Sequence, residues 1–114
     1  MFTTKRVYEE PDKNDGTRVL VDRLWPRGLK KEHARIDYWM KEVAPSNALR
    51  KWFAHKEERW QEFKHRYHEE LKGKKALMKQ LSVLGKDKKV TLLYAARDEK
   101  RNNARALLEI LETQ

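Results

Sequence analysis

The sequence lacks several residue types and patterns on which common functions depend. It contains no cysteine, which excludes disulfide bonds, thiol catalysis and cysteine-ligated zinc and fits a reducing compartment. Its four glycines are isolated, so no glycine-rich phosphate loop is present. No stretch has the length of an apolar membrane span, and the first ten residues lack the apolar segment of a signal peptide. We therefore expect a cytoplasmic protein with no membrane segment and no cofactor.

Charge is abundant and mostly positive. The 114 residues include 27 Lys and Arg against 18 Asp and Glu, a formal net charge of +9. Such a balance favours anionic partners, such as nucleic acid, phosphorylated metabolites or an acidic protein. Many lysines, however, lie at the ends of expected helices, where they complement the helix dipole. Most of the lysine charge is accordingly interpreted as an ordinary solvated surface.

The order of apolar segments predicts one α/β domain over residues 1–114. Three stretches rich in apolar or β-branched residues predict strands, at 3–8, 18–24 and 89–96. A long, mainly helical segment separates the second strand from the third, and a parallel pair needs such a crossover. The predicted fold is a small, mainly parallel three-stranded sheet packed with several helices.

Helical spacing of apolar residues locates the expected helices. Ile36, Trp39, Met40 and Val43 predict a helix between residues 30 and 44, although its start is not fixed by the sequence. Ser46 is expected to cap the next helix. Further helices are expected at 57–72 and around 77–84, and Asp98 is expected to cap the last one.

Charged and aromatic side chains follow two of the predicted strands. The second strand ends in VDRLWPRG, and the third in YAARD. Parallel strands bring their carboxyl ends to one edge of a sheet, where open α/β sheets bind ligands. We therefore expect a concave site formed by Asp22, Arg23, Trp25, Arg27, Tyr94 and Arg97. Two structural interpretations stay open, in which Asp22 pairs with Arg97 or Arg23, or Trp25 is a core aromatic.

These stretches also carry a family resemblance. KRVY, DG, RVLVDRLWPRG, APS, LRKWF and VTLLYAARD, in this order and spacing, resemble the YeaO-like proteins, a short branch of the family called domain of unknown function 488. The resemblance covers nearly the whole chain. It implies a small bacterial or archaeal cytoplasmic α/β protein, and it supplies no function.

The chain departs from the wider family at two positions that matter for chemistry. The longer branch has a cysteine after the apolar strand and a Cys-His-Arg segment near the last helix, where this chain has Tyr94 and Arg101-Asn102-Asn103. Cysteine chemistry is therefore not carried over. YeaO-like proteins often have Asn-His-Ala where this chain has Asn102-Asn103-Ala104, so a histidine base is not carried over either. Asn102 is interpreted as a loop contact or, alternatively, a ligand contact at the rim of the site.

The histidines give little support for a metal. His65 and His68 are spaced i, i+3 on an expected helix, but no carboxylate beyond Glu69 completes a ligand set. No metal site is predicted. His55 is interpreted as a loop or cap residue.

Three functional hypotheses follow from these residues. In the first, Arg23, Arg27 and Arg97 hold a small phosphate or carboxylate ligand, Trp25 or Tyr94 stacks on a planar group, and Asp22 is an acid, a base or an orienting group. In the second, the net charge binds nucleic acid weakly and without sequence preference. In the third, the chain is an interaction protein without chemistry. The sequence decides neither whether a reaction is catalysed nor the oligomeric state.

Overall fold

The computed structural model describes residues 1–113. Its centre is a four-stranded, entirely parallel sheet with the order β1-β4-β2-β3. The strands are β1 (Phe2–Arg6), β2 (Thr17–Leu20), β3 (Tyr38–Trp39) and β4 (Val90–Tyr94). The α/β class and the parallel pairing of the second and last predicted strands are confirmed.

The number of strands was wrong in the sequence analysis, which expected three. The fourth strand, β3, lies inside the segment expected to be a helix between residues 30 and 44. That segment instead forms a one-turn helix α1 (Lys31–Ala34), then β3, then a 3-10 turn η2 (Lys41–Val43). Tyr38 and Trp39 pair with Val19 and Leu20 of β2, and this long-range pairing outweighs the helical spacing of the local apolar residues.

The remaining helices follow the predicted order. They are α2 (Asn47–Phe53), η3 (Glu57–Arg59) with α3 (Trp60–Lys72), α4 (Lys75–Leu84) and α5 (Asn103–Glu112), and a 3-10 turn η1 (Lys13–Asp15) was not predicted. Ser46 caps α2 as expected, accepting a hydrogen bond from the Leu49 N–H. The expected cap of α5 was wrong: Asp98 accepts from the N–H groups of Lys100 and Arg101 in a turn, and Asn102 caps the helix.

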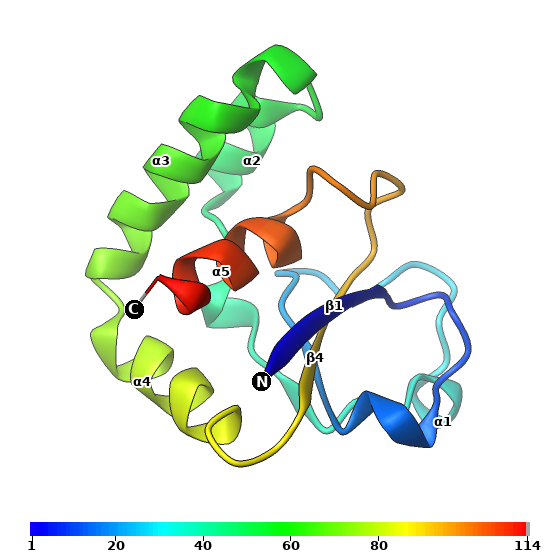
Figure 1. The fold of residues 1–114 in the computed structure, drawn as a ribbon. Helices are drawn as coiled ribbons and strands as arrows, with labels where there is room; N and C mark the ends of the chain where they lie inside the picture. The colour runs from blue at the N-terminus through cyan, green and yellow to red at the C-terminus, as the bar shows by residue number, and fades with distance from the viewer. Residues whose placement is uncertain (114) are drawn as a thin grey trace.

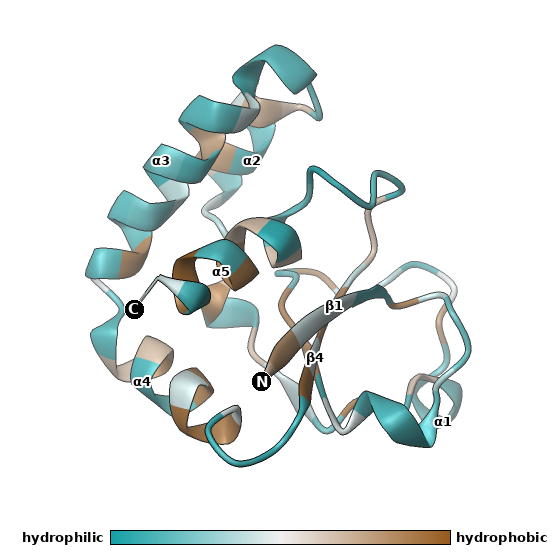
Figure 2. Ribbon diagram, viewed as in Figure 1, coloured by the Kyte–Doolittle hydropathy of each residue, from teal (hydrophilic) through white to brown (hydrophobic). Residues whose placement is uncertain are grey.

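The two faces of the sheet are covered by different parts of the chain. Alternate residues of β2 and β4, including Val19 and Leu92, pack with α2, α3, α4 and α5 in the main core. Leu20 and Leu93 point to the opposite face, where Leu29 and Ile36 cover them. Figure 1 shows α3, α4 and α5 on one side of the strands and α1 on the other. The apolar colouring of Figure 2 concentrates on the strands and on α5, while the exposed turns of α3 are hydrophilic.

A buried ion pair lies where the chain enters β2. The Arg18 guanidinium donates to the Asp15 carboxylate, and both residues are less than one-tenth exposed. Lys5 adds a second cation, 3.1 Å from Asp15. Burial opposes ionisation of Asp15, but hydrogen bonds from the Asp12 backbone, Lys5 and Arg18 outweigh it and lower its pKa. The buried carboxylate of Asp15 is therefore fully paired.

Candidate functional site

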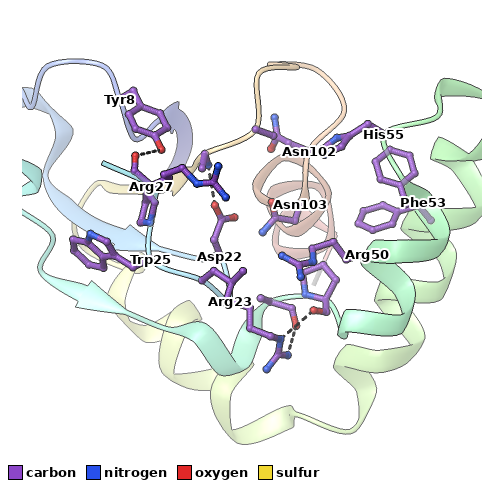
Figure 3. Close-up of a pocket in the computed structure, with 17 residues that line it drawn as sticks. Tyr8, Asp22, Arg23, Trp25, Arg27, Arg50, Phe53, His55, Asn102 and Asn103 are labelled. Carbon is purple, nitrogen blue, oxygen red and sulfur yellow. Dashed lines mark hydrogen bonds between the residues drawn. The ribbon is translucent and has the colours of Figure 1, made fainter. Parts of the chain in front are cut away.

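A cavity of about 380 Å³ opens at the carboxyl edge of the sheet. It lies between the segment that follows β2, the amino-terminal end of α5 and the side of α2 (Figure 3). We call it the strand-end hollow. Its lining combines charged and apolar side chains: Tyr8, Asp22, Arg23, Leu24, Trp25, Pro26, Arg27, Ala44, Pro45, Arg50, Phe53, His55, Phe63, Ala95, Ala96, Asn102 and Asn103.

The segment after β2 is held in place by aromatic donors. Pairing of β2 ends at Leu20, four residues earlier than expected, and only the Val21 N–H still donates to Leu93. The chain is then fixed at three points, because aromatic side chains donate hydrogen bonds of 2.7–2.8 Å to backbone carbonyls. These bonds are Trp39 to Asp22, Tyr8 to Arg27, and Trp25 to Leu29. Trp25 also packs edge-on against Trp39, with ring centroids 5.5 Å apart. This segment therefore presents Asp22, Arg23 and Arg27 from a fixed backbone.

Asp22 lies at the centre of the hollow. Its Oδ2 accepts the Ala95 N–H at 2.8 Å, and this bond ties the end of β2 to the end of β4. The Asn103 amide lies beside the carboxylate and donates to the Val21 carbonyl at 2.9 Å. Burial raises the pKa of Asp22, against the opposing effects of Asn103, the Ala95 N–H and the charge of Arg50. No cation forms an ion pair with Asp22 within residues 1–113.

Three arginines surround this carboxylate. Arg23 donates to the Ala44 carbonyl at 3.2 Å and to the Pro45 carbonyl at 3.4 Å, which holds its half-buried guanidinium at the floor of the hollow. Arg50 comes from α2 and points into the hollow in Figure 3, with one bond of 3.2 Å to Asn47. Arg27 lines the hollow from the segment after β2. In the described part of the chain, none of the three forms an ion pair.

The structure separates the expected site residues into two groups. Asp22, Arg23, Trp25, Arg27 and Asn102 all line the hollow. Tyr94 and Arg97 do not: Tyr94 is 3% exposed and belongs to the main core, and Arg97 is an exposed residue of the loop before α5. The pairing of Asp22 with Arg97 or Arg23, weighed as an alternative, is absent from residues 1–113.

Asn102 has a structural role at the rim. Its Oδ1 accepts the Arg105 N–H at 2.8 Å as the cap of α5, and its amide donates to the Asp98 carbonyl at 2.9 Å. The side chain is thereby engaged as both acceptor and donor. Asn102 positions the first turn of α5, including Asn103, against Asp22.

Sequence reasoning missed Arg50 and Asn103 as lining residues. Arg50 lies within the LRKWF stretch, but its position depends on how α2 is docked. The Ser46 N–H and hydroxyl both donate to Glu70 of α3, and this contact fixes the start of α2. Such a tertiary contact leaves no local pattern. The paired asparagines at 102–103 were the one signal that could have located Asn103.

The far rim is formed by a strained turn between α2 and η3. Ala54 and His55 have φ angles of 45° and 57°, in the left-handed region that non-glycine residues seldom adopt. Arg101 bridges this side of the molecule to the loop before α5, with its Nη1 3.1 Å from Glu57. His55 and Asn102 face each other across the rim in Figure 3. The opening is thus bounded by two segments that an ion pair links.

Neither a metal-binding cluster nor a membrane helix occurs among the described residues. No three His, Asp or Glu side chains of residues 1–113 gather where they would hold a metal ion. None of the helices in that range combines the length and the hydropathy of a membrane span. The polar groups that line the hollow are three guanidinium groups, one carboxylate, the amides of Asn102 and Asn103, the Tyr8 hydroxyl and the His55 imidazole.

Comparison with known proteins identifies the family. The family model described as "Inactive DUF488-N3 subclade" matches residues 1–114. The uncharacterized protein YeaO of Escherichia coli is 40% identical over 109 residues, covering 96% of this chain and 95% of that protein. The chain is a YeaO-like member of the DUF488 family. Uncharacterized proteins from Mycobacterium tuberculosis and Mycobacterium bovis are each 45% identical over 106 residues, covering 93% of this chain and 89% of the relative.

The family assignment confirms the resemblance seen in the sequence. No solved structure matches the chain. The names of these DUF488 relatives state no activity, and the description of the matching subclade calls it inactive.

Proposed function

We propose that the protein binds a small phosphate- or carboxylate-bearing ligand in the strand-end hollow, without catalysing its conversion. The observation that carries the proposal is that Arg23, Arg27 and Arg50 line one cavity while none of them forms an ion pair within residues 1–113. Elsewhere in the fold, the buried Arg18 is matched by Asp15. Cations gathered without anionic partners in a cavity suit an anionic ligand.

The guanidinium groups keep free donors. Each guanidinium carries five N–H donors in a planar fork. Arg23 uses two contacts to backbone carbonyls and Arg50 one to Asn47, so both retain donors for a planar or tetrahedral oxyanion. The carbonyl contacts of Arg23 also orient its side chain before a ligand arrives, which reduces the entropy lost on binding.

The apolar walls suit a ligand larger than an ion. Phe53 and Phe63 stack with ring centroids 4.5 Å apart on the α2–α3 side, and Trp25, Pro26 and Pro45 line the hollow as well. A cavity of about 380 Å³ falls in the range of small-molecule sites. The absence of catalysis is proposed from the description of the matching subclade. We therefore assign Asp22 a binding role and not that of an acid or base.

Thermal unfolding with and without inorganic phosphate tests the proposal. A ligand that binds the folded state raises the melting temperature, by an amount that grows with the logarithm of its concentration relative to Kd. We expect phosphate to stabilise the parent protein and Lys51→Ala equally, and to stabilise Arg50→Ala much less. Lys51 is a matched control, because it is the next residue of α2, is exposed, carries the same charge and does not line the hollow.

The same melting measurement distinguishes the arginines that line the hollow from Arg97, which the sequence also placed in the site. Arg97→Ala should keep the response to phosphate, because Arg97 is outside the hollow. The proposal is wrong if phosphate leaves the melting temperature of the parent unchanged, or if Arg50→Ala responds as strongly as Lys51→Ala.

A further inference from the structure

We infer that the ligand of the strand-end hollow is a phosphate monoester with a hydroxylated carbon skeleton, whose hydroxyl groups donate to Asp22. This inference rests on the proposed function and narrows the ligand class. It starts from an apparent contradiction, since a carboxylate at the centre of an anion site repels the anion. The contradiction disappears if one ligand carries both an anionic group for the arginines and a donor for Asp22.

The contacts of Asp22 leave it able to accept further hydrogen bonds. A carboxylate has about four acceptor positions. Within residues 1–113, the protein supplies one donor with hydrogen-bond geometry, the Ala95 N–H, which lies 2.8 Å from Oδ2, while the Asn103 amide beside the carboxylate donates to the Val21 carbonyl. No fully buried side-chain oxygen or nitrogen within residues 1–113 lacks a hydrogen-bond partner. The acceptor positions of Asp22 that the protein leaves unused are therefore not buried, and because Asp22 lines the hollow, they face it. The bond from Ala95 also fixes the direction of the carboxylate, and Figure 3 draws this bond as a dashed line at Asp22.

The charge balance favours a dianion over a monoanion. Three guanidinium groups and one carboxylate leave the hollow with two net positive charges. A phosphate monoester carries nearly two negative charges at neutral pH, whereas a single carboxylate would leave one positive charge unmatched. Guanidinium forks also fit the oxygens of phosphate in bidentate geometry.

The position of Asp22 favours hydroxyl donors on the body of the ligand. The carboxylate lies on the sheet side of the hollow, and Phe53 and Phe63 line its walls on the α2–α3 side, where Figure 3 shows Phe53. A phosphate bound by the arginines would place the attached carbon skeleton between Asp22 and these walls. Acidic side chains at the ends of parallel strands commonly accept ribose hydroxyls in α/β proteins. Sugar phosphates and nucleoside monophosphates fit this description.

A matched pair of small esters tests the inference. Glycerol 3-phosphate and n-propyl phosphate have the same carbon number and the same phosphate, and differ in two hydroxyl groups. Calorimetric titration of the parent should give tighter binding of glycerol 3-phosphate by about ten-fold, the value of one hydrogen bond to a charged acceptor. Ribose 5-phosphate should bind at least as tightly as glycerol 3-phosphate.

Asp22→Asn provides the decisive variant. The asparagine oxygen still accepts the Ala95 N–H, so the fold is retained, and melting temperature serves as the check. Without the charge, n-propyl phosphate should bind more tightly than to the parent, because the repulsion is gone. The ratio of the affinity for glycerol 3-phosphate to the affinity for n-propyl phosphate should fall toward one. Arg50→Ala should weaken both esters together and keep their ratio.

The outcomes distinguish the inference from the proposed function. If both esters bind, Arg50→Ala weakens them, and the parent shows no preference, the inference is overturned and the anion site stands. A preference for glycerol 3-phosphate that survives in Asp22→Asn also overturns the inference and leaves the anion site standing, because Asp22 would then not be the source of the preference. If neither ester nor inorganic phosphate binds, the proposed function fails and the inference fails with it.

Discussion

At the scale of single residues, Asp22 and Asp15 show opposite treatments of a buried carboxylate. Asp15 is paired with Arg18 and Lys5, and its pKa is lowered. Asp22 has backbone and amide contacts but no ion pair within residues 1–113, and burial raises its pKa. The first arrangement stabilises the fold near neutral pH, whereas the second costs free energy when Asp22 is ionised. A carboxylate kept at such a cost in a cavity is typical of a binding site.

The raised pKa of Asp22 predicts the sign of a pH effect. Its folded-state pKa lies above the ordinary value of 3.8, so the protonated form favours folding. The contribution of Asp22 to the free energy of unfolding is therefore greatest below pH 3.8 and declines as the pH rises through the raised pKa. Asp22→Asn removes this decline and keeps an acceptor for the Ala95 N–H.

Urea unfolding of the parent and Asp22→Asn, at about pH 4 and again near neutral pH, checks this prediction. The variant should gain stability relative to the parent as the pH rises. At neutral pH it should lose no more than about 0.5 kcal/mol, the usual range of a neutral substitution. A loss well beyond that value, growing with pH, would make Asp22 a structural residue and remove the argument for a binding role.

At the scale of elements, the sequence predicted those parts that local pattern determines. The apolar runs at 18–24 and 89–96 gave two central strands, and Ser46 gave the start of α2. The two-residue strand β3 was missed because Tyr38 and Trp39 become a strand only by pairing with β2. Asp98 and Asn102 are both good capping residues, and only the path of the loop decides that Asn102 caps α5. For the same reason, the position of Arg50 beside Asp22 was not readable from sequence.

Two glycines with positive φ predict different costs of substitution by alanine. Gly16 precedes β2 with a φ of 67°, and a Cβ there would lie 2.3 Å from the Lys89 carbonyl oxygen. Gly28 has a φ of 76°, but a Cβ would meet nothing within 4 Å. Gly28→Ala therefore measures the cost of the backbone conformation alone, about 1 kcal/mol, and Gly16→Ala adds a backbone clash. We expect Gly16→Ala to cost about 2–3 kcal/mol or more.

Chemical denaturation of the two variants measures both costs directly. Equal losses for Gly16→Ala and Gly28→Ala would contradict the close approach of β2 and the segment before β4. Gly28→Ala also reports on the hollow, because Gly28 follows Arg27. Because Gly28 does not itself line the hollow and a Cβ there meets nothing, Gly28→Ala should keep the response to phosphate.

At the scale of the whole molecule, the positive charge has two components. One is local, in the three arginines of the strand-end hollow. The other is spread over exposed lysines at several helix ends and turns, among them Lys72, Lys75, Lys86, Lys88 and Lys89. On α3 these charges alternate with acidic residues, and pairs such as Arg66 with Glu62 and Lys72 with Glu69 neutralise part of them. This pattern gives the surface formed by residues 1–113 a diffuse positive field.

The diffuse component predicts weak, sequence-independent binding to nucleic acid. Binding that depends on phosphate contacts releases counterions, so its affinity falls steeply with salt. Fluorescence titrations with unrelated duplex and single-stranded DNA or RNA should give similar affinities that vanish as ionic strength rises to the physiological range. Arg50→Ala and Lys51→Ala should weaken this binding equally, because each removes one surface charge, although only Arg50→Ala affects phosphate in the hollow. Tight binding to one sequence that survives added salt, or a selective loss in Arg50→Ala, would instead make nucleic acid the ligand of the hollow and overturn the assignment to a small ester.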